Sequence, residues 1–414
     1  MAQSYIKRIL NAQVYDVARE TPLDAAPLLS GRLGNQAFLK REDLQPVFSF
    51  KCRGAYNKMV NLDEAARAAG VVAASAGNHA QGVALAASKL GIKATIVMPI
   101  TTPLIKVDAV KALGAKVVIH GDSFDEAAVR ARALTESEGF SFIHPFDDPD
   151  VIAGQGTVAV ELVRQAQQPL DYVFVCCGGG GLLAGMAAYL RYVWPHTRII
   201  GVEPEDAACV QAALEKGRRV TLREVGLFAD GCAVAQVGKE TFRLIRECVD
   251  EVITVSTDEI CAAVKDIFED TRAIAEPAGA LAVAGMKKYS AEHDVTGASM
   301  AATVSGANTN FDRLRYISER TEIGERREAV LSVTIPERPG SLLQFLTVLG
   351  NEYSISLFHY RNHGAAFGRI LVGMQVPEGK RAALRKALNR LGYRFWEETD
   401  NPAYREYLGP AEQI

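Results

Sequence analysis

The sequence lacks any stretch of eighteen apolar residues, so we expect no membrane-spanning helix. Its first twenty residues, MAQSYIKRILNAQVYDVARE, contain no uninterrupted apolar segment, so we expect no signal peptide. No basic stripe and no acidic tail stand out against a formal net charge of -3. This balance argues against nucleic acid and against a membrane surface as partners.

Disulfide and metal-binding motifs are missing as well. The seven cysteines are scattered, odd in number and without a C-x-x-C, a usage typical of reduced thiols in a cytoplasmic protein. The seven histidines include His359 and His363 four residues apart, but a metal site needs three or four converging ligands. We therefore expect a cytoplasmic protein without a metal site.

The chain has 414 residues, which is more than one hydrophobic core ordinarily organises, so we expect two or three domains. From about residue 60 to residue 310, short apolar runs alternate with helical patterns. Apolar runs without alternation predict strands buried on both faces, and their alternation with helices predicts parallel α/β sheets. The predicted strands are VVAAS (71–75), ATIVMP (94–99), AKVVIH (115–120), YVFVCC (172–177) and RIIGVEP (198–204).

The pattern changes near residue 321, where the charged stretch EIGERRE begins. We predict a linker over residues 321–330, after a domain of residues 1–320 that contains a smaller subdomain at about 50–150. Residues 331–414 show the order strand, helix, strand, strand, helix, strand, which is the ferredoxin-like βαββαβ order. Pro339 and Gly340 fall where the first of these strands must turn into a helix.

The segment CGGGGLLAG (177–185) directly follows a predicted strand and opens a helix. Consecutive glycines let the backbone approach a ligand closely, and the free N–H groups of a helix N-terminus favour an anion such as phosphate. Gly179, Gly181 and Ala184 also satisfy G-x-G-x-x-A, and Glu203 follows about twenty residues later, which keeps a dinucleotide site open. A tight connection without a ligand is the structural alternative.

Lys51 lies in the stretch SFKCRGAY (49–56), beside aromatic residues and two positions before Arg53. The ordinary interpretation is a surface cation whose stem covers apolar neighbours. Desolvation together with a like charge would instead leave the amine partly neutral, and such a lysine is a nucleophile. Arg53 either lowers the pKa of this amine or packs and pairs elsewhere.

Two polar turns follow apolar runs. In ASAGNHAQG (74–82), Ser75, Asn78 and His79 stand at the carboxyl end of a strand, where open α/β sheets bind ligands. Ser75 also suits a helix N-cap and Asn78 a turn, so this segment alone decides nothing. TVSGANTNF (303–311) by itself predicts only a turn.

Taken together, these stretches resemble the pyridoxal-phosphate enzymes of the tryptophan-synthase β fold (fold type II), an α/β fold with two parallel-sheet subdomains. Within that group the first 320 residues are most similar to biosynthetic threonine deaminase (threonine ammonia-lyase). The last 85 or so residues resemble the ACT-like regulatory domain of that family, present here once, whereas the longer form has two. The resemblance rests on SFKCRGAYNKM, SAGNHAQGVA, GGGGLLAG, GLFADGCAV (226–234), residues 258–289 and VSGANTNFDRLRYISER.

The resemblance implies a role for each turn. Lys51 would attach pyridoxal 5'-phosphate covalently, while Cys52 is a packing variant at a position that is often leucine. Asn78 would donate to the phenolic oxygen of the ring, and Ser305 would face the ring nitrogen. The phosphate would be held by backbone N–H groups of Gly178, Gly179, Gly180, Gly181 and Leu182, and the substrate carboxylate by Ser75, Ala76, Gly77, Asn78 and His79.

The implied reaction is the deamination of L-threonine to 2-oxobutanoate and ammonia, the first step of isoleucine biosynthesis, with L-serine as a further substrate. Ala76 stands where the related serine racemases carry a proton-transferring serine, so we expect elimination without efficient racemisation. The resemblance also implies a homotetramer and inhibition by isoleucine, with valine as an opposing effector. Candidate effector residues lie in SISLFHYRNHGAAFGR (354–369).

Three alternatives stay open on the sequence. A related dehydratase of serine and threonine, or a serine racemase-like enzyme, stays open because selection between the two substrates depends on one methyl group, and the sequence does not identify the pocket wall that contacts it. A nicotinamide-dependent dehydrogenase would use the G-x-G-x-x-A run and Glu203, but it leaves Lys51, Asn78 and Ser305 without roles. A non-catalytic amino-acid sensor would keep the fold and have no need of Lys51.

Overall fold

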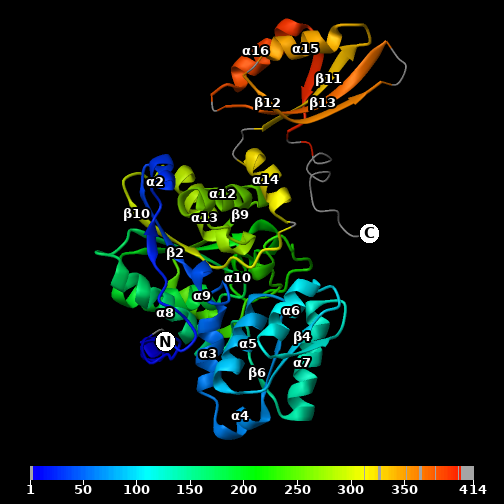
Figure 1. The fold of residues 1–414 in the computed structure, drawn as a ribbon. Coiled ribbons are helices and arrows are strands. Elements are labelled where there is room, and N and C mark those ends of the chain that lie inside the picture. Colours follow the sequence, from blue (N-terminus) through cyan, green and yellow to red (C-terminus); the bar gives the residue numbers. More distant parts are fainter. Residues whose placement is uncertain are drawn as a thin grey trace. The chain divides into compact units, whose positions relative to one another are not determined.

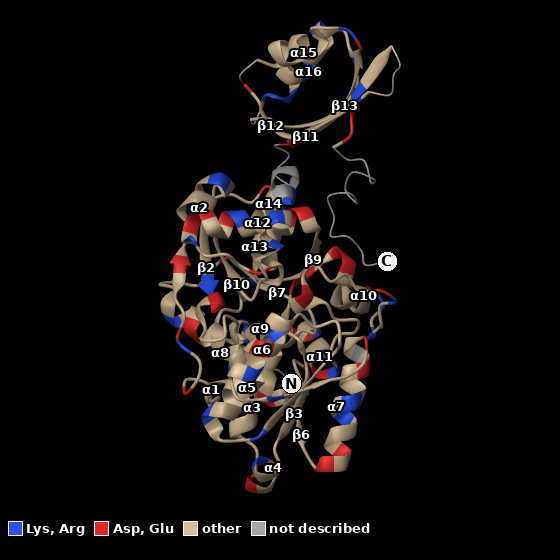
Figure 2. Ribbon diagram, turned by 45° about the vertical axis from the view of Figure 1, so that its right-hand side comes forward, with Lys and Arg blue, Asp and Glu red and all other residues tan. Residues whose placement is uncertain are grey.

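The computed structural model describes residues 3–311, 313–324, 328–350, 352–362, 366–377, 379–399 and 401. The chain divides into two compact units, Met1–Thr309 and Asn310–Ile414 (Figure 1). Figure 2 shows charges of both signs interspersed along surface helices of the first unit, such as α7 and α12. None of the helices formed by the described residues combines the length and the apolar character needed to cross a membrane.

The larger sheet of the first unit has the strand order β1-β2-β10-β7-β8-β9. Neighbouring strands are parallel except β1 and β2, which are antiparallel. Every residue of β10 is buried, as expected of a strand covered on both faces. The strands are β1 Leu23–Ala25, β2 Gln36–Arg41, β7 Tyr172–Cys176, β8 Arg198–Pro204, β9 Glu251–Val255 and β10 Ser299–Val304.

The smaller sheet has the all-parallel order β5-β4-β3-β6. Side chains of β3 alternate between two apolar clusters: Val71 and Ala73 pack with α3 and α5, and Val72 and Ala74 pack with α7. The central strands β3 and β4 are buried throughout, which confirms the prediction of buried parallel strands for residues 71–74 and 94–98. The predicted strand at 115–120 forms the edge strand β5, which is only partly buried because one of its edges has no neighbouring strand in the sheet. Its strands are β3 Val71–Ala74, β4 Ala94–Met98, β5 Lys116–Ile119 and β6 Ser141–Phe142.

Four helices of the first unit begin at a residue whose side chain accepts from their free N–H groups. Asp63 caps α4, Ser123 caps α7 and Asp148 caps α8, while Ser256 and Glu259 form a capping box on α12. The helices are α1 Gln3–Leu10, α2 Pro27–Leu33, α3 Lys51–Val60, α4 Glu64–Ala69, α5 Asn78–Leu90, α6 Leu104–Ala112, α7 Phe124–Glu138, α8 Pro149–Gln165, α9 Gly181–Val193, α10 Cys209–Glu215, α11 Lys239–Cys248, α12 Thr257–Thr271 and α13 Pro277–Glu292, with 3-10 turns η1 Glu42–Leu44, η2 Glu205–Ala207 and η3 Asp230–Cys232.

The second unit begins with α14 Arg313–Gly324 and continues as an antiparallel sheet of order β12-β13-β11-β14. The chain order confirms the predicted βαββαβ pattern, and apolar residues of α15 and α16 pack on the sheet to form the core. Within the predicted linker, residues 321–324 end α14 and residues 328–330 begin β11. The other elements are β11 Glu328–Pro336, α15 Ser341–Leu349, β12 Ser354–Arg361, β13 Phe367–Gln375, α16 Arg381–Leu391 and β14 Arg394–Glu397.

Candidate active site

The predicted site residues lie at the carboxyl ends of strands from both parallel sheets. Ser75 follows β3, the glycine loop 178–181 follows β7 and Ser305 follows β10, while Lys51 begins α3. The backbone N–H of Phe50 donates to the carbonyl of Ser305 at 3.3 Å. Ligands bind at this edge of parallel α/β sheets, so the two sheets present their ligand-binding ends to each other.

The Lys51 amine lies inside this region. Its Nζ donates to the carbonyl of Pro145 at 3.1 Å and lies 5.2 Å from the centroid of the Phe50 ring. Burial lowers the pKa of the amine, while Cys232, Cys176 and Glu276 act in the opposite direction. The neutral amine, which attacks a carbonyl carbon, is therefore more populated than for an exposed lysine.

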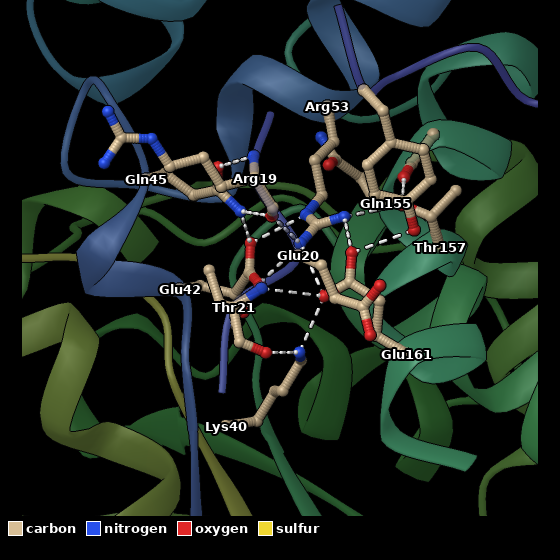
Figure 3. Close-up of polar contacts among 12 residues, drawn as sticks. Arg19, Glu20, Thr21, Lys40, Glu42, Gln45, Arg53, Gln155, Thr157 and Glu161 are labelled. Carbon is tan, nitrogen blue, oxygen red and sulfur yellow. Dashed lines mark hydrogen bonds and ion pairs between the residues drawn. The ribbon is translucent and has the colours of Figure 1, made fainter. Parts of the chain in front are cut away.

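Arg53, two residues further on, pairs with Glu42 and Glu161 in a buried cluster (Figure 3). Its guanidinium is fully buried, with Nε 2.8 Å from Glu42 Oε2 and Nη1 2.5 Å from Glu161 Oε1. Lys40 completes the cluster, its Nζ 2.6 Å from Glu161 Oε2. Two cations thus meet two carboxylates, and the positive charge of Arg53 is neutralised. Of the two sequence-based alternatives for Arg53, pairing elsewhere is the one observed.

The glycine loop between β7 and α9 accepts no side chain at its centre. Gly180 has φ of 91°, in the left-handed region that favours glycine. A Cβ on Gly179 would lie 2.3 Å from the Phe146 ring, and one on Gly178 would lie 2.8 Å from Cys232 Cα. The first N–H groups of α9 have no acceptor within the helix, so the loop fits a phosphate group.

The turn from Ser75 to His79 begins α5. The backbone N–H of Gly77 donates to Ser75 Oγ at 3.2 Å. The buried His79 ring holds Nε2 2.8 Å from the carbonyl of Ile143, which can only accept, so Nε2 carries the hydrogen. Burial and then the charge of Lys51 lower the pKa of His79 to about 3. His79 is therefore a neutral structural donor, which leaves the backbone N–H groups of this turn and the side chains of Ser75 and Asn78 to contact a ligand.

Asn78 and Ser305 already have partners in the protein. Asn78 Nδ2 donates to Glu276 Oε1 at 2.6 Å, and Asn78 Oδ1 accepts from Asn308 Nδ2 at 2.6 Å. The buried Ser305 hydroxyl donates to the carbonyl of Ala278 at 3.3 Å. The amide of Asn78 has one hydrogen left for a ligand, because its nitrogen carries two.

Sequence reasoning assigned no role to Glu276 and Asn308, which contact Asn78 directly. Glu276 lies 198 positions from Asn78 along the chain. Its position directly before Pro277, the first residue of α13, was the available signal, because glutamate is not a favoured N-cap residue. Burial and then Asp230 raise the pKa of Glu276 to about 8.

The segment after β6 was also missed, although it contacts several parts of the site. His144 Nδ1 accepts from the backbone N–H groups of Phe146 and Asp147, at 3.2 and 2.8 Å. Pro145 accepts from the Lys51 amine, and Phe146 covers Gly179. The carboxylate of Asp147 then accepts from the first N–H groups of α11. The polar stretch HPFDD after an apolar strand was the signal for it.

Glu203, the predicted acidic partner of a dinucleotide, has another task. Its carboxylate accepts from the backbone N–H groups of Val210 and Gln211, at 2.9 and 2.8 Å, at the start of α10. Burial raises its pKa to about 7. Among all residues that the structure describes, no group of three or more His, Cys, Asp or Glu residues is arranged to hold a metal ion.

Two family models match the chain. Residues 14–306 match the model of pyridoxal-phosphate dependent enzymes, and residues 319–408 match that of the C-terminal regulatory domain of threonine dehydratase. The first match contains Lys51, Asn78, the glycine loop and Ser305.

Individual relatives agree with these matches. Biosynthetic L-threonine dehydratase of Burkholderia multivorans is 45% identical over 504 aligned positions, covering 98% of this chain and 99% of the relative. Other relatives are bacterial, chloroplastic or mitochondrial threonine dehydratases. The structure of threonine deaminase isoform 2 from Solanum lycopersicum superposes with a TM-score of 0.76 and 49% identity, covering 77% of this chain and 93% of that one. The structure of maize serine racemase superposes with a TM-score of 0.70 and 31% identity, covering 78% of this chain and 98% of that one.

Proposed function

This chain belongs to the biosynthetic threonine dehydratases, pyridoxal-phosphate-dependent lyases with a C-terminal regulatory domain, and we propose that Lys51 attaches the cofactor and takes the substrate α-proton. Enzymes of this family deaminate L-threonine in the isoleucine pathway. The observation that carries the proposal is the Lys51 amine itself. It is enclosed where two parallel sheets present their carboxyl ends, beside a glycine loop that opens a helix.

Each element of the site has one task in this proposal. When bound, pyridoxal 5'-phosphate supplies an acceptor for the electron pair that the Cα–H bond releases. The backbone N–H groups of residues 178–182 would hold its phosphate, the remaining amide hydrogen of Asn78 would meet the phenolic oxygen, and Ser305 would face the ring nitrogen. The turn from Ser75 to His79 orients the substrate carboxylate with backbone N–H groups at the start of α5.

Proton transfer falls to Lys51. With the substrate amine bound to the cofactor, the Lys51 amine would be free to accept the α-proton, because burial favours its neutral form. Loss of the Cα proton and of the β-hydroxyl group removes one water from threonine, and hydrolysis of the product gives 2-oxobutanoate and ammonia. A serine hydroxyl at Ser305 cannot balance a positive ring nitrogen as a carboxylate would. The negative charge left by loss of the Cα proton must therefore leave promptly with the hydroxyl group, which favours elimination over transamination.

We propose L-serine as a second substrate, since it carries the same β-hydroxyl group. A single methyl group in a pocket changes the transition-state free energy by only about 1–3 kcal/mol. The purified protein with added cofactor should turn over both amino acids, threonine with the higher kcat/KM. A protein that binds a nicotinamide dinucleotide and turns over neither amino acid would refute this function.

For the whole chain we propose a catalytic domain over 1–320, a linker over 321–330 and a regulatory domain over 331–414. The match of residues 319–408 to the regulatory-domain model of threonine dehydratase supports a regulatory unit in this part of the chain. Isoleucine would bind to this unit and inhibit the enzyme, because it has a higher affinity for an inactive state than for an active state. Valine would oppose this inhibition. Candidate effector residues are 354–369, of which residues 363–365 lie outside the described residues. We further propose a homotetramer in the cytoplasm.

Regulation is tested with the full chain and with a chain ending at residue 324. Initial rates of 2-oxobutanoate formation are measured against isoleucine, with and without valine. Inhibition of the full chain that disappears in the truncated chain supports the assignment. Equal inhibition of both chains would place the effector site in the first unit and refute it.

A further inference from the structure

The orientation of the Asn78 amide can be traced to a carbonyl outside the site. Asn308 Nδ2 donates to the carbonyl of Val47 at 2.8 Å, and that carbonyl can only accept. The same nitrogen donates to Asn78 at 2.6 Å, so the atom of Asn78 that faces Asn308 must be the oxygen. The amide nitrogen of Asn78 is thereby turned toward Glu276, whose Oε1 accepts from it at 2.6 Å.

Glu276 is held in place from several sides. It precedes α13 without using its carboxylate to cap that helix, and its backbone N–H donates to the carbonyl of Gly306 at 3.1 Å. A Cβ on Gly306 would lie 2.5 Å from Glu276 Oε1, and one on Gly231 would lie 3.5 Å from it. The residue is 3% exposed. Its side chain therefore serves Asn78 and has little freedom to turn away.

Resting on the role proposed above for Asn78, we propose that Glu276 and Asn308 are positioning residues that together fix the Asn78 amide, so that its second hydrogen points at the phenolic oxygen of the cofactor ring. Asn308 fixes which end of the amide is the donor. Glu276 takes one of the two hydrogens and holds the nitrogen in place. The carboxyl group of Glu276 also sets the charge beside the ring oxygen.

The titratable groups around this carboxyl come from four elements. Asp230 in η3 disfavours its ionised form, and Lys106 in α6, paired with Asp230 at 2.7 Å, favours it. Cys176 at the end of β7 disfavours ionisation of Glu276, and the Glu276 charge acts in turn on the Lys51 amine of α3. Glu276 therefore passes from neutral to charged near pH 8, and the bound cofactor should sense that step.

The test compares Glu276→Ala, Glu276→Gln and Asn308→Ala with the wild type and with Asp266→Asn. Asp266 is a buried carboxylate that pairs with Arg32 and Lys287, so it controls for removing a buried charge. Three quantities are measured without substrate: the cofactor dissociation constant, the cofactor absorption spectrum from pH 6 to 9.5, and the thermal midpoint of the cofactor-free protein.

Glu276→Ala and Asn308→Ala should each weaken cofactor binding about two- to tenfold and shift the absorption band, since each removes one of the hydrogen bonds that hold the Asn78 amide. Glu276→Gln keeps an acceptor, so affinity should recover to within about twofold of wild type, but the spectral step near pH 8 should vanish. Asp266→Asn should leave affinity and spectrum unchanged.

Wild-type affinity and an unchanged spectral titration in all three site variants would overturn the inference. Where Glu276→Ala does not fold, Asn308→Ala, which leaves the carboxyl in place, decides the matter. Borohydride reduction of the wild type separates the two proposals. If the cofactor is fixed on Lys51 and the three site variants keep wild-type affinity and spectral titration, only the positioning role is refuted. If no cofactor is fixed on Lys51, the proposed function is refuted.

Discussion

The guanidinium Nη1 of Arg53 lies 2.5 Å from Glu161 Oε1, and both side chains are fully buried. Removing one partner of such a pair leaves an uncompensated buried charge. Arg53→Met should therefore lower the free energy of unfolding of the cofactor-free protein by roughly 3–5 kcal/mol, measured by urea titration. Arg243→Met, which breaks partly exposed pairs with Glu240 and Glu247, should cost no more than about 1 kcal/mol. Equal losses in the two variants would contradict this account of the cluster.

Gly179→Ala should remove cofactor binding, because its Cβ would lie 2.3 Å from the Phe146 ring and must displace either the ring or the loop. Gly31→Ala is the matched control: it lies in α2, with no atom within 4 Å of the added methyl group. It should be neutral or stabilising by about 0.4–1 kcal/mol. Equilibrium dialysis of both variants against the cofactor makes the comparison. Tight binding by Gly179→Ala would show that the loop tolerates a side chain.

Ala76 should keep the enzyme from racemising, since a methyl group transfers no proton. Incubation of the wild type with L-serine and chiral chromatography should show 2-oxo acid formation with little D-serine. Ala76→Ser should raise the ratio of D-serine to 2-oxo acid. Rapid D-serine formation by the wild type would refute the interpretation of this position.

The stability of the cofactor-free protein should depend on Glu276 in a defined pH window. Burial raises the pKa of this carboxyl from 4.5 to about 8, so the native state binds the proton more tightly than the unfolded state. The Glu276 contribution to stability is thus present below pH 4.5 and is lost as the pH rises to about 8. Relative to Glu276→Gln, the wild type should lose on the order of a few kcal/mol between pH 4.5 and 8.5. A constant difference across this range, from urea titrations, would refute the shift.

The sequence predicted those features that local patterns encode. Apolar runs such as residues 71–75 and 172–177 predicted the buried strands, because a strand covered on both faces must be apolar throughout. The glycine loop 178–181 was conspicuous because consecutive glycines are costly unless a tight approach requires them. The resemblance then assigned roles to Lys51, Asn78 and Ser305, and those roles remain predictions.

The missed residues act through contacts between distant segments. Glu276 reaches Asn78 over 198 positions, and the fate of the Arg53 charge depended on Glu161, 108 positions away. No local pattern indicates which carboxylate a buried cation meets. The loop after β6 likewise gains its role only when Phe146 packs on Gly179 and Pro145 meets Lys51.

The most direct test of the central claim is to reduce the cofactor-loaded protein with borohydride and map the added mass by peptide mass spectrometry. The account predicts a pyridoxyl mass on the peptide that contains Lys51. Lys51→Ala should carry no such mass and lose nearly all turnover, while still binding the cofactor through the glycine loop. A pyridoxyl mass on another lysine, or full turnover by Lys51→Ala, would contradict it.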